Sequence, residues 1–412
     1  MLYEILTTSS MGAIALSTYF LQNKKSSNDH EKIKMIANAA GLKTKDESIR
    51  IRRRNRNKNH TEYVYQMPLG LSYKQFEAEK DAFVDGLNNK STLDIQWSKF
   101  KYMDWKGDIV KQIRNILTHR KRLDKNLEIE YDGMLKFRVY DEGLKKKYQY
   151  NDDILQKGWT VPIGYSFKEL LTHDFEKRPH MIIAGTTGFG KSEYIKLLIS
   201  TLIKQQPNNV RLHLIDLKGG SELGVFKDLD QTVSFGRTIK ETKEILKDAQ
   251  ADMEHKSNLQ FKRGVNNVNK AGQKERHFVI IDEAATLDKD CKEIVTDIAR
   301  RGRSAGYRLI YATQYPTNET LPSQVRANIG VRLCYRLETN AQSRAVLDEG
   351  GAEELPEIEG RAIFRRVKNH IVQTPLIDDR QIDDVVGPHI NIKGDVDAES
   401  KGRRNTFKFE EI

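Results

Sequence analysis

The sequence contains little cysteine, no visible internal repeat and only one long apolar run. Its 412 residues include two cysteines, Cys291 and Cys334, with no CxxC pair and no histidine at metal-ligand spacing. The two thiols lie on two different expected elements, so we interpret them as small buried apolar groups in a reducing compartment. This interpretation argues against a redox or metal-binding role for either residue.

The single long apolar run is residues 2–21. Its length suits one membrane span of about 20 residues, and Lys24 and Lys25 would then hold the rest of the chain in the cytoplasm. Glu4 and several Ser and Thr residues weaken the hydropathy, so a soluble helix is the alternative. A cleaved signal peptide fits poorly because no basic region precedes the run. An anchor here would place the protein at the cytoplasmic face of the cell membrane.

The basic residues are unevenly distributed. The formal net charge is +11; residues 1–160 hold 30 Lys and Arg against 21 Asp and Glu, whereas the remaining 252 residues hold 39 against 37. A basic excess favours a polyanionic partner, either nucleic acid or an acidic membrane face. The densest cationic run, residues 50–58, would be a solvated segment or would contact DNA phosphates or anionic lipid.

Composition and periodicity divide the chain into four segments: a candidate anchor and basic linker (1–60), a small α/β module (61–159), a larger α/β domain (160–378) and a polar tail (379–412). In the module we expect a strand, a helix over 72–89 capped by Ser72 and a hairpin around Asp132 and Gly133. In the larger domain, apolar runs alternate with helical stretches, which predicts a parallel sheet covered on both faces. The expected strands are residues 180–185, 210–216, 277–282, 307–313, 329–337 and 361–367.

The strongest motif is GTTGFGKS, which follows an apolar strand and leads into a helix. This GxxxxGKS pattern in a strand–loop–helix context is typical of a phosphate-binding P-loop, rather than of a glycine-rich turn with a surface lysine. The glycines let backbone N–H groups surround phosphates, and the helix N-terminus adds positive potential. Lys191 would reach the β- and γ-phosphates of ATP, and Ser192 would hold Mg²⁺. The nucleotide-binding residues are therefore expected to be Gly185, Thr186, Thr187, Gly188, Phe189, Gly190, Lys191 and Ser192.

Two further strand ends carry polar side chains. The strand 277–282 ends in Asp282, followed by Glu283. Asp282 would sit beside the magnesium ion and its waters, and Glu283 would orient and activate the attacking water. On an ordinary strand end, adjacent acids would instead be solvated charges. The strand 307–313 is followed by Gln314, whose amide could sense the γ-phosphate or belong to a simple loop.

In this order the motifs resemble the motor domain of the FtsK/SpoIIIE family of DNA translocases. The resemblance covers residues 160–367 and rests on RPHMIIAGTTGFGKS (178–192), LIDLKGGSEL (214–223), RGVNNVN (263–269), IARRGRSAGYRLIYATQYP (298–316), RANIGVRL (326–333) and SRAVLDEGGAEEL (343–355). It implies a RecA-like P-loop NTPase fold of the ASCE type, preceded here by the small α/β module. It also implies a homo-hexameric ring around DNA.

The resemblance assigns further residues. Gln314 matches the sensor position, and Arg332 and Arg344 match arginines near the family's subunit boundary. One of the two would act in trans as an arginine finger, or each would form an ordinary surface salt bridge. Arg300, Arg301 and Arg303 are a second source of such a finger. A loop that corresponds to residues 262–276 faces the channel in the family, which makes Lys262, Arg263 and Lys270 candidates for sequence-independent phosphate contacts.

The chain also departs from the chromosome-segregation members, because it has at most one membrane span and no room after residue 378 for a winged-helix domain. This layout resembles the conjugative coupling or transfer proteins of Gram-positive plasmids and integrative elements. We therefore expect an ATP-driven DNA translocase that works with a relaxase and transfer-channel proteins. The alternatives are a nucleotide-gated scaffold that recruits a relaxase or replication protein, and a protein-secretion ATPase.

Overall fold

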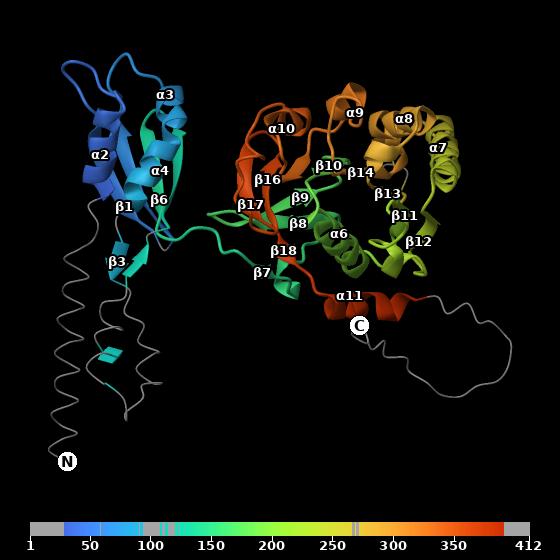
Figure 1. Ribbon diagram of the computed structural model, residues 1–412. Coiled ribbons are helices and arrows are strands. Elements are labelled where there is room, and N and C mark those ends of the chain that lie inside the picture. Colours follow the sequence, from blue (N-terminus) through green and yellow to red (C-terminus); the bar gives the residue numbers. More distant parts are fainter. Residues whose placement is uncertain are drawn as a thin grey trace. The chain divides into compact units, whose positions relative to one another are not determined.

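The computed structural model describes residues 29–57, 59–89, 91–93, 108, 112, 113, 120–122, 124–265, 268 and 272–390. The chain divides into two compact units, Met1–Gly143 and Leu144–Ile412 (Figure 1). The boundary lies earlier than the expected one at residue 160, because the intervening residues pack into the second unit. Ile154 and Trp159, for example, belong to the hydrophobic core of that unit.

The first unit is an antiparallel sheet with helices on one face (Figure 1). The strand order is β1 (Arg50–Arg56), β2 (His60–Gln66), β6 (Leu135–Tyr140) and β5 (Asn126–Tyr131). Alternate strand residues such as Tyr65 and Phe137 pack against Phe76 and Phe83 of the helices. The helices are α2 (Asp29–Ala39), α3 (Tyr73–Ala78) and α4 (Lys80–Asn88), and a small ribbon pairs β3 (Ser91–Leu93) with β4 (Arg120–Arg122).

Two sequence-based expectations for this unit need correction. The basic run that we expected to be a linker forms the edge strand β1, because its backbone pairs with β2 while its side chains stay mostly exposed. The single helix expected over 72–89 is broken at Glu79 into α3 and α4. The hairpin is confirmed, since β5 and β6 pair around Asp132 and Gly133. Ser72 precedes α3 as expected, and its N–H donates to the Gln75 side chain at 2.8 Å.

The second unit is built on a ten-stranded sheet in the order β12-β11-β13-β14-β10-β15-β16-β17-β8-β9. The first six strands are parallel: β12 (Thr232–Gly236), β11 (Val210–Asp216), β13 (Arg276–Asp282), β14 (Tyr307–Thr313), β10 (Met181–Ala184) and β15 (Arg332–Tyr335). The other four form an antiparallel wing: β16 (Arg361–Arg365), β17 (Asn369–Gln373), β8 (Thr160–Tyr165) and β9 (Leu170–Asp174). The expectation that residues 361–367 join a parallel sheet is therefore wrong, because β16 is antiparallel to β15.

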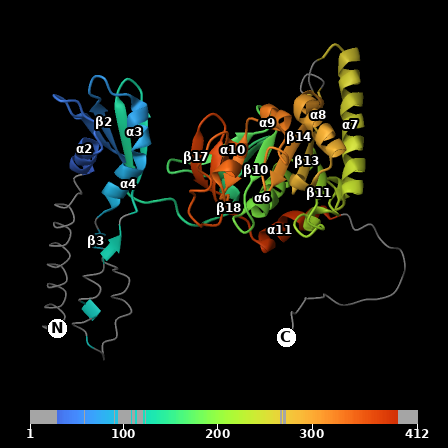
Figure 2. The same ribbon diagram turned by 45° about the horizontal axis from the view of Figure 1, so that its top comes forward.

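Helices cover both faces of this sheet. They are α6 (Lys191–Gln205), α7 (Ile239–Lys262), α8 (Lys289–Ala305), α9 (Ser323–Asn328), α10 (Asn340–Leu347) and α11 (Asp379–Val386). Short 3-10 turns lie at Asp152–Ile154, Gly224–Phe226, Ala284–Thr286 and Gly387–His389, and a two-residue ribbon pairs β7 (Tyr148–Gln149) with β18 (Pro375–Leu376). The long helix α7 lies along the outer side of α8 (Figure 2).

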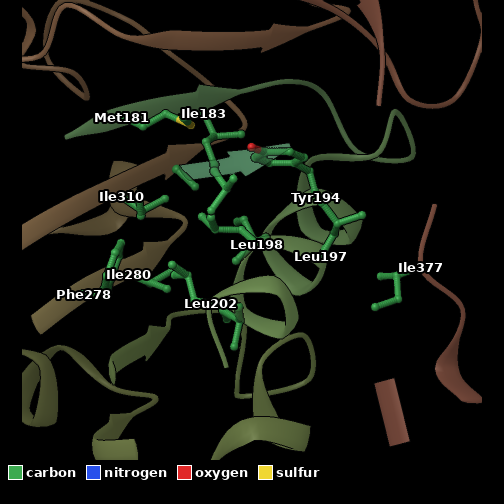
Figure 3. Packing of buried hydrophobic residues seen from close by; sticks show 14 of the residues in the cluster. Met181, Ile183, Tyr194, Leu197, Leu198, Leu202, Phe278, Ile280, Ile310 and Ile377 are labelled. Atoms are coloured by element: carbon green, nitrogen blue, oxygen red, sulfur yellow. The ribbon is translucent and has the colours of Figure 1, made fainter. Parts of the chain in front are cut away.

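The sheet separates two hydrophobic cores. Met181 and Ile183 of β10 point toward α6, where they meet Leu198 and other side chains of one core (Figure 3). Ile182 and Ala184 point to the opposite core, which α7, α8, α9 and α10 cover. Because successive strand residues alternate faces, a strand buried on both faces reads as a continuous apolar run. Full burial of one such side chain contributes roughly 1.5–3 kcal/mol.

Several other expectations can be compared with the structure. The polar tail expected from residue 379 begins as α11, whose Ile382 and Val385 pack into the core with α6. Cys291 and Cys334 are free and buried, and burial raises the pKa of Cys291 to about 12. Within the described residues, no helix combines the length and the apolar character that a bilayer crossing needs. The apolar run 2–21 lies outside those residues.

Candidate nucleotide site

The P-loop forms a tight turn between the end of β10 and the start of α6. Gly188 and Gly190 adopt left-handed φ angles of 84° and 106°, which glycine tolerates without strain. Gly185 is needed for a different reason, since an added Cβ there would lie 2.5 Å from the Cβ of Tyr335. The turn leads directly into the N-terminus of α6, where helix geometry favours an anion.

Lys191, the first residue of α6, is buried and its ammonium group contacts the Asp282 carboxylate. The two residues come from α6 and from the end of β13, which are neighbours only in the folded chain. The second oxygen of Asp282, Oδ2, is buried and has no hydrogen-bond partner in the part of the chain that the structure describes. An unsatisfied buried acceptor costs about 1–3 kcal/mol, so this oxygen suits a ligand such as a hydrated cation.

Glu283 follows Asp282 in an unusual backbone conformation. Its φ of 65° is left-handed, which for a residue with a long side chain costs on the order of 1–3 kcal/mol. The side chain is thereby held at the carboxyl end of the sheet. Its Oε1 accepts hydrogen bonds from the Thr313 hydroxyl and the Gln314 N–H, both at 3.3 Å. Its Oε2 is buried without a hydrogen-bond partner among the described residues.

Gln314 connects the acidic pair to the P-loop. It directly follows β14, which lies between β10 and β13 in the sheet. The Thr187 hydroxyl donates to the Gln314 side-chain oxygen at 2.9 Å, while the Gln314 backbone reaches Glu283. A change at the P-loop can therefore reach Glu283 through two hydrogen bonds and one residue.

The P-loop and Gln314 line a cavity of about 350 Å³, whereas Asp282 and Glu283 are not among its lining residues. Thr186, Thr187, Gly188, Gly190, Lys191, Ser192 and Gln314 contribute to one wall. Donors that fit a nucleotide are present: the P-loop backbone and Lys191 suit its phosphates, and Ser192 with Asp282 suits Mg²⁺. Magnesium is usually held by few protein ligands together with phosphate oxygens. The described residues contain no cluster of three or more His, Cys, Asp or Glu side chains that could hold a metal ion.

Sequence reasoning missed Lys218, which lies after β11. Its ammonium nitrogen is 3.9 Å from Asp282 Oδ2, and the residue lines the cavity. The buried Asp216 carboxylate holds this loop, since it accepts the Lys218 N–H at 3.1 Å and the N–H groups of Glu222 and Leu223 at 2.9 Å each. One signal in the sequence could have identified Lys218: it follows the carboxyl end of an expected parallel strand, residues 210–216, as the other site residues follow theirs.

The far wall of the cavity was also missed. It consists of Lys146, Lys147, Glu359, Gly360, Gln373, Thr374, Pro375 and Leu376. These residues come from the antiparallel wing and from the segment after the first unit. They carry no recognisable motif, and nothing in the sequence links them to the P-loop.

The two candidate trans-acting arginines lie away from the cavity. Arg332 is buried in β15, where burial lowers its pKa and its guanidinium donates to the Val346 carbonyl at 2.6 Å and to Asp348 at 2.5 Å. Arg344 is exposed on α10, and no hydrogen bond or ion pair holds its side chain within the described residues. The structure therefore leaves Arg344 available for an intermolecular contact and commits Arg332 to the interior.

The second arginine group and the basic loop lie elsewhere on the unit. Arg300 and Arg301 pair with Asp297; burial opposes ionisation of that carboxyl, but these hydrogen bonds lower its pKa to about 2. Arg303 is exposed near the end of α8. Lys262 and Arg263 are exposed where α7 ends, and Lys270 lies outside the described residues.

The strand order and the convergence of P-loop, acidic pair and sensor amide define a RecA-like P-loop ATPase fold. Residues 156–345 match the model of the FtsK/SpoIIIE family. The DNA translocase FtsK of Pseudomonas syringae pv. tomato is 29% identical over 235 residues, which cover 48% of this chain and 29% of that protein. The chain thus spans less than a third of the length of this relative.

Solved structures share the fold. The pCW3 conjugation coupling protein TcpA, in its monomer form with ATPγS, matches with a TM-score of 0.57 and 17% identity, covering 87% of this chain and 99% of that one. The cytoplasmic domain of the Thermomonospora curvata type VII secretion ATPase EccC matches with a TM-score of 0.51 and 21% identity, covering 60% and 33%. At these identities the likeness concerns the fold.

Proposed function

We propose that this protein is an ATP-driven motor that moves DNA during conjugative or mobile-element transfer. The observation that carries the proposal is the meeting of Lys191, Asp282, Glu283 and Gln314 at one edge of a RecA-like sheet. Hydrolysis of a nucleoside triphosphate requires groups of these kinds. Lys191 would bind the phosphates, Asp282 would lie beside the metal ion, Glu283 would orient the attacking water, and Gln314 would sense the γ-phosphate. The resemblance to DNA translocases directs the proposal toward DNA.

In this proposal the P-loop N–H groups and Lys191 bind the β- and γ-phosphates of ATP. Lys191 then exchanges part of its contact with Asp282 for phosphate oxygens. Ser192 and Asp282 hold Mg²⁺, which supplies charge neutralisation at the phosphates when bound. The Oδ2 of Asp282 supports this assignment, because it has no hydrogen-bond partner among the described residues and a hydrated cation would satisfy it.

Glu283 is the group that orients water and accepts its proton. Thr313 and Gln314 fix one carboxylate oxygen, while the other has no hydrogen-bond partner among the described residues. Gln314 senses the γ-phosphate through its contact with Thr187. A positioned general base contributes roughly 10²–10⁴-fold to a rate.

The proposal also covers assembly and DNA contact, which involve residues outside the nucleotide site. We propose a homo-hexamer in which Arg344 acts in trans as the finger, because Arg332 is committed to interior carbonyl and carboxylate groups. Lys262 and Arg263 would contact DNA phosphates without regard to sequence, and such contacts weaken as salt rises. A relaxase, transfer-channel proteins and an anchor at residues 2–21, on the cytoplasmic face of the membrane, complete the proposed setting.

A protein-secretion ATPase is the second candidate, because the fold likeness extends to the type VII secretion ATPase EccC. The two candidates differ in what stimulates the motor. Duplex DNA should raise the ATPase rate of a DNA motor and leave that of a secretion ATPase unchanged.

The test is ATPase activity of the full-length protein with and without DNA, together with displacement of a third strand from a DNA triplex. Lys191→Ala should abolish hydrolysis and displacement because the phosphates lose their buried cation. Lys204→Ala is the matched control, since this lysine lies at the other end of α6 and pairs with Asp152. Full turnover in Lys191→Ala would refute the site, and turnover without triplex displacement would favour a scaffold.

A further inference from the structure

The segment that leaves the first unit lies along the nucleotide cavity. Residues 144–150, which we call the strap, begin directly after Gly143, where the first unit ends. Two consecutive lysines of the strap, Lys146 and Lys147, line the same cavity as the P-loop. The neighbouring Lys145 does not line it; its ammonium group lies over the ring of Tyr148, 5.9 Å from the ring centroid.

The backbone of the strap is fixed at both ends. At its start, the buried Arg361 donates to the carbonyls of Leu144 and Lys145, at 3.1 Å and 3.4 Å. At its end, the Tyr150 N–H donates to the Leu376 carbonyl at 2.8 Å. Between these points, β7 pairs in parallel with β18. Lys146 and Lys147 are therefore presented to the cavity by an ordered backbone rather than by a free loop.

The same contacts connect the strap to the P-loop. Arg361 also donates to the Gln373 side chain at 2.9 Å, and the Gln373 amide donates to the Glu359 carbonyl at 2.6 Å. The next residue, Gly360, donates its N–H to the carbonyl of Phe189 in the P-loop at 2.9 Å. An added Cβ at Gly190 of the P-loop would lie 3.1 Å from the Gly360 nitrogen, so the wall and the P-loop are closely packed.

The charges on the far wall suit an anion. No hydrogen bond or ion pair occupies the ammonium groups of Lys146 and Lys147 within the described residues. Three acidic residues also line the cavity: Glu193 and Glu222 pair with Lys196 at 2.9 Å and 3.9 Å, and Glu359 belongs to the same wall as the two lysines. At about 350 Å³ the cavity is at the small end of ligand pockets, which span roughly 300–1,000 Å³, so a bound nucleotide would touch both walls.

We propose that Lys146 and Lys147 bind the phosphates of the nucleotide from the part of the cavity lining outside the P-loop, so that nucleotide occupancy further restrains the strap through which the first unit is joined to the motor. This inference rests on the proposed function, since it takes the ligand to be a nucleoside triphosphate. It adds two binding residues that no motif identifies. It also makes the connection between the two units responsive to the state of the nucleotide site.

The test compares full-length variants in their binding of ATPγS, measured by calorimetry. Lys146→Ala/Lys147→Ala should raise the dissociation constant on the order of 10-fold, because two charge-assisted contacts are lost. Lys145→Ala is the matched control from the same run and should bind as the unchanged protein does. Lys146→Arg/Lys147→Arg should restore most of the affinity, which a purely structural loss would not do.

Hydrogen exchange supplies the second readout. ATPγS should slow amide exchange in residues 144–150 of the unchanged protein and of Lys145→Ala, but not of the double alanine variant at matched saturation. Equal affinity in the double alanine variant and Lys145→Ala would overturn the inference, and so would strap protection that persists without the two lysines. These outcomes are separate from the tests of the proposed function, which are loss of hydrolysis in Lys191→Ala, stimulation by DNA and triplex displacement.

Discussion

Glu283→Gln isolates the chemical step of the proposed motor. The amide has nearly the shape of the carboxylate, so its oxygen can still accept from Thr313 and Gln314 at the observed 3.3 Å. What is lost is the charge and the ability to accept a proton at the unpartnered Oε2. Because a positioned base contributes about 10²–10⁴-fold, turnover should fall by that factor, equivalent to about 3–5 kcal/mol in the activation barrier.

Binding and folding should respond differently from turnover. The P-loop and Lys191 are untouched, so the dissociation constant for ATPγS should change by less than about threefold. The substitution removes a buried charge with one unpaired oxygen, so thermal stability should stay equal or rise. With hydrolysis blocked, the ATP-bound assembled state should accumulate.

The assay is single-turnover hydrolysis at saturating ATP, with nucleotide binding and the unfolding midpoint measured on the same preparations. Glu293→Gln is the control, since this glutamate is exposed on α8 and has no role in the cavity. Turnover of Glu283→Gln within tenfold of the control would refute the assignment of Glu283 as the base. A large loss of ATPγS binding would instead mean that Glu283 holds the nucleotide.

The other expectations concern stability and DNA contact. Leu198→Ala should lower the free energy of unfolding by about 2–5 kcal/mol in urea titrations, because Leu198 is fully buried beneath the sheet. Burial lowers the pKa of His180 to about 3, so the unfolded chain binds a proton below about pH 6.5 that the folded chain does not. The contribution of His180 to the free energy of unfolding should therefore be complete above this pH and should be lost as the pH drops toward 3. A melting temperature that increases when the pH is lowered from 7.5 to 5 would contradict this. Lys262→Ala/Arg263→Ala should reduce DNA stimulation of the ATPase and lower the slope of log affinity against log salt by about 2.

Much of the parallel half of the sheet could be predicted from sequence because burial on both faces leaves a visible pattern. The runs that became β10, β11, β13 and β14 are continuous apolar stretches that end in polar residues. Those ends place Lys191, Asp282 and Gln314 at one edge, since parallel strands share a carboxyl end. The antiparallel direction of β16 was not visible, because its apolar pattern resembles that of a parallel strand and direction depends on the connection.

The remaining misses have a common physical cause, which is that one sequence does not reveal pairing between distant segments. The basic run that became β1 has no buried side chain, so its strand character depends on the backbone of β2. Arg332 and Arg344 read alike in sequence, yet one is buried against Asp348 and the other is exposed. The far wall of the cavity likewise depends on contacts between residues more than two hundred positions apart, such as Arg361 with Leu144.

The two walls of the cavity suggest how one binding event could have two outputs. On the P-loop side, Thr187 reaches Gln314 and through it Glu283, so occupancy there bears on the hydrolytic step. On the opposite side, the Phe189 carbonyl reaches Gly360 and, through Gln373 and Arg361, the strap. Rigid, hydrogen-bonded connections of this kind transmit a change only if each has two arrangements. Both connections start from the same glycine-rich turn. A γ-phosphate that moves this turn would therefore affect the hydrolytic step and the strap at the same time. A motor needs hydrolysis and structural change to be coupled in this way if turnover is to produce movement.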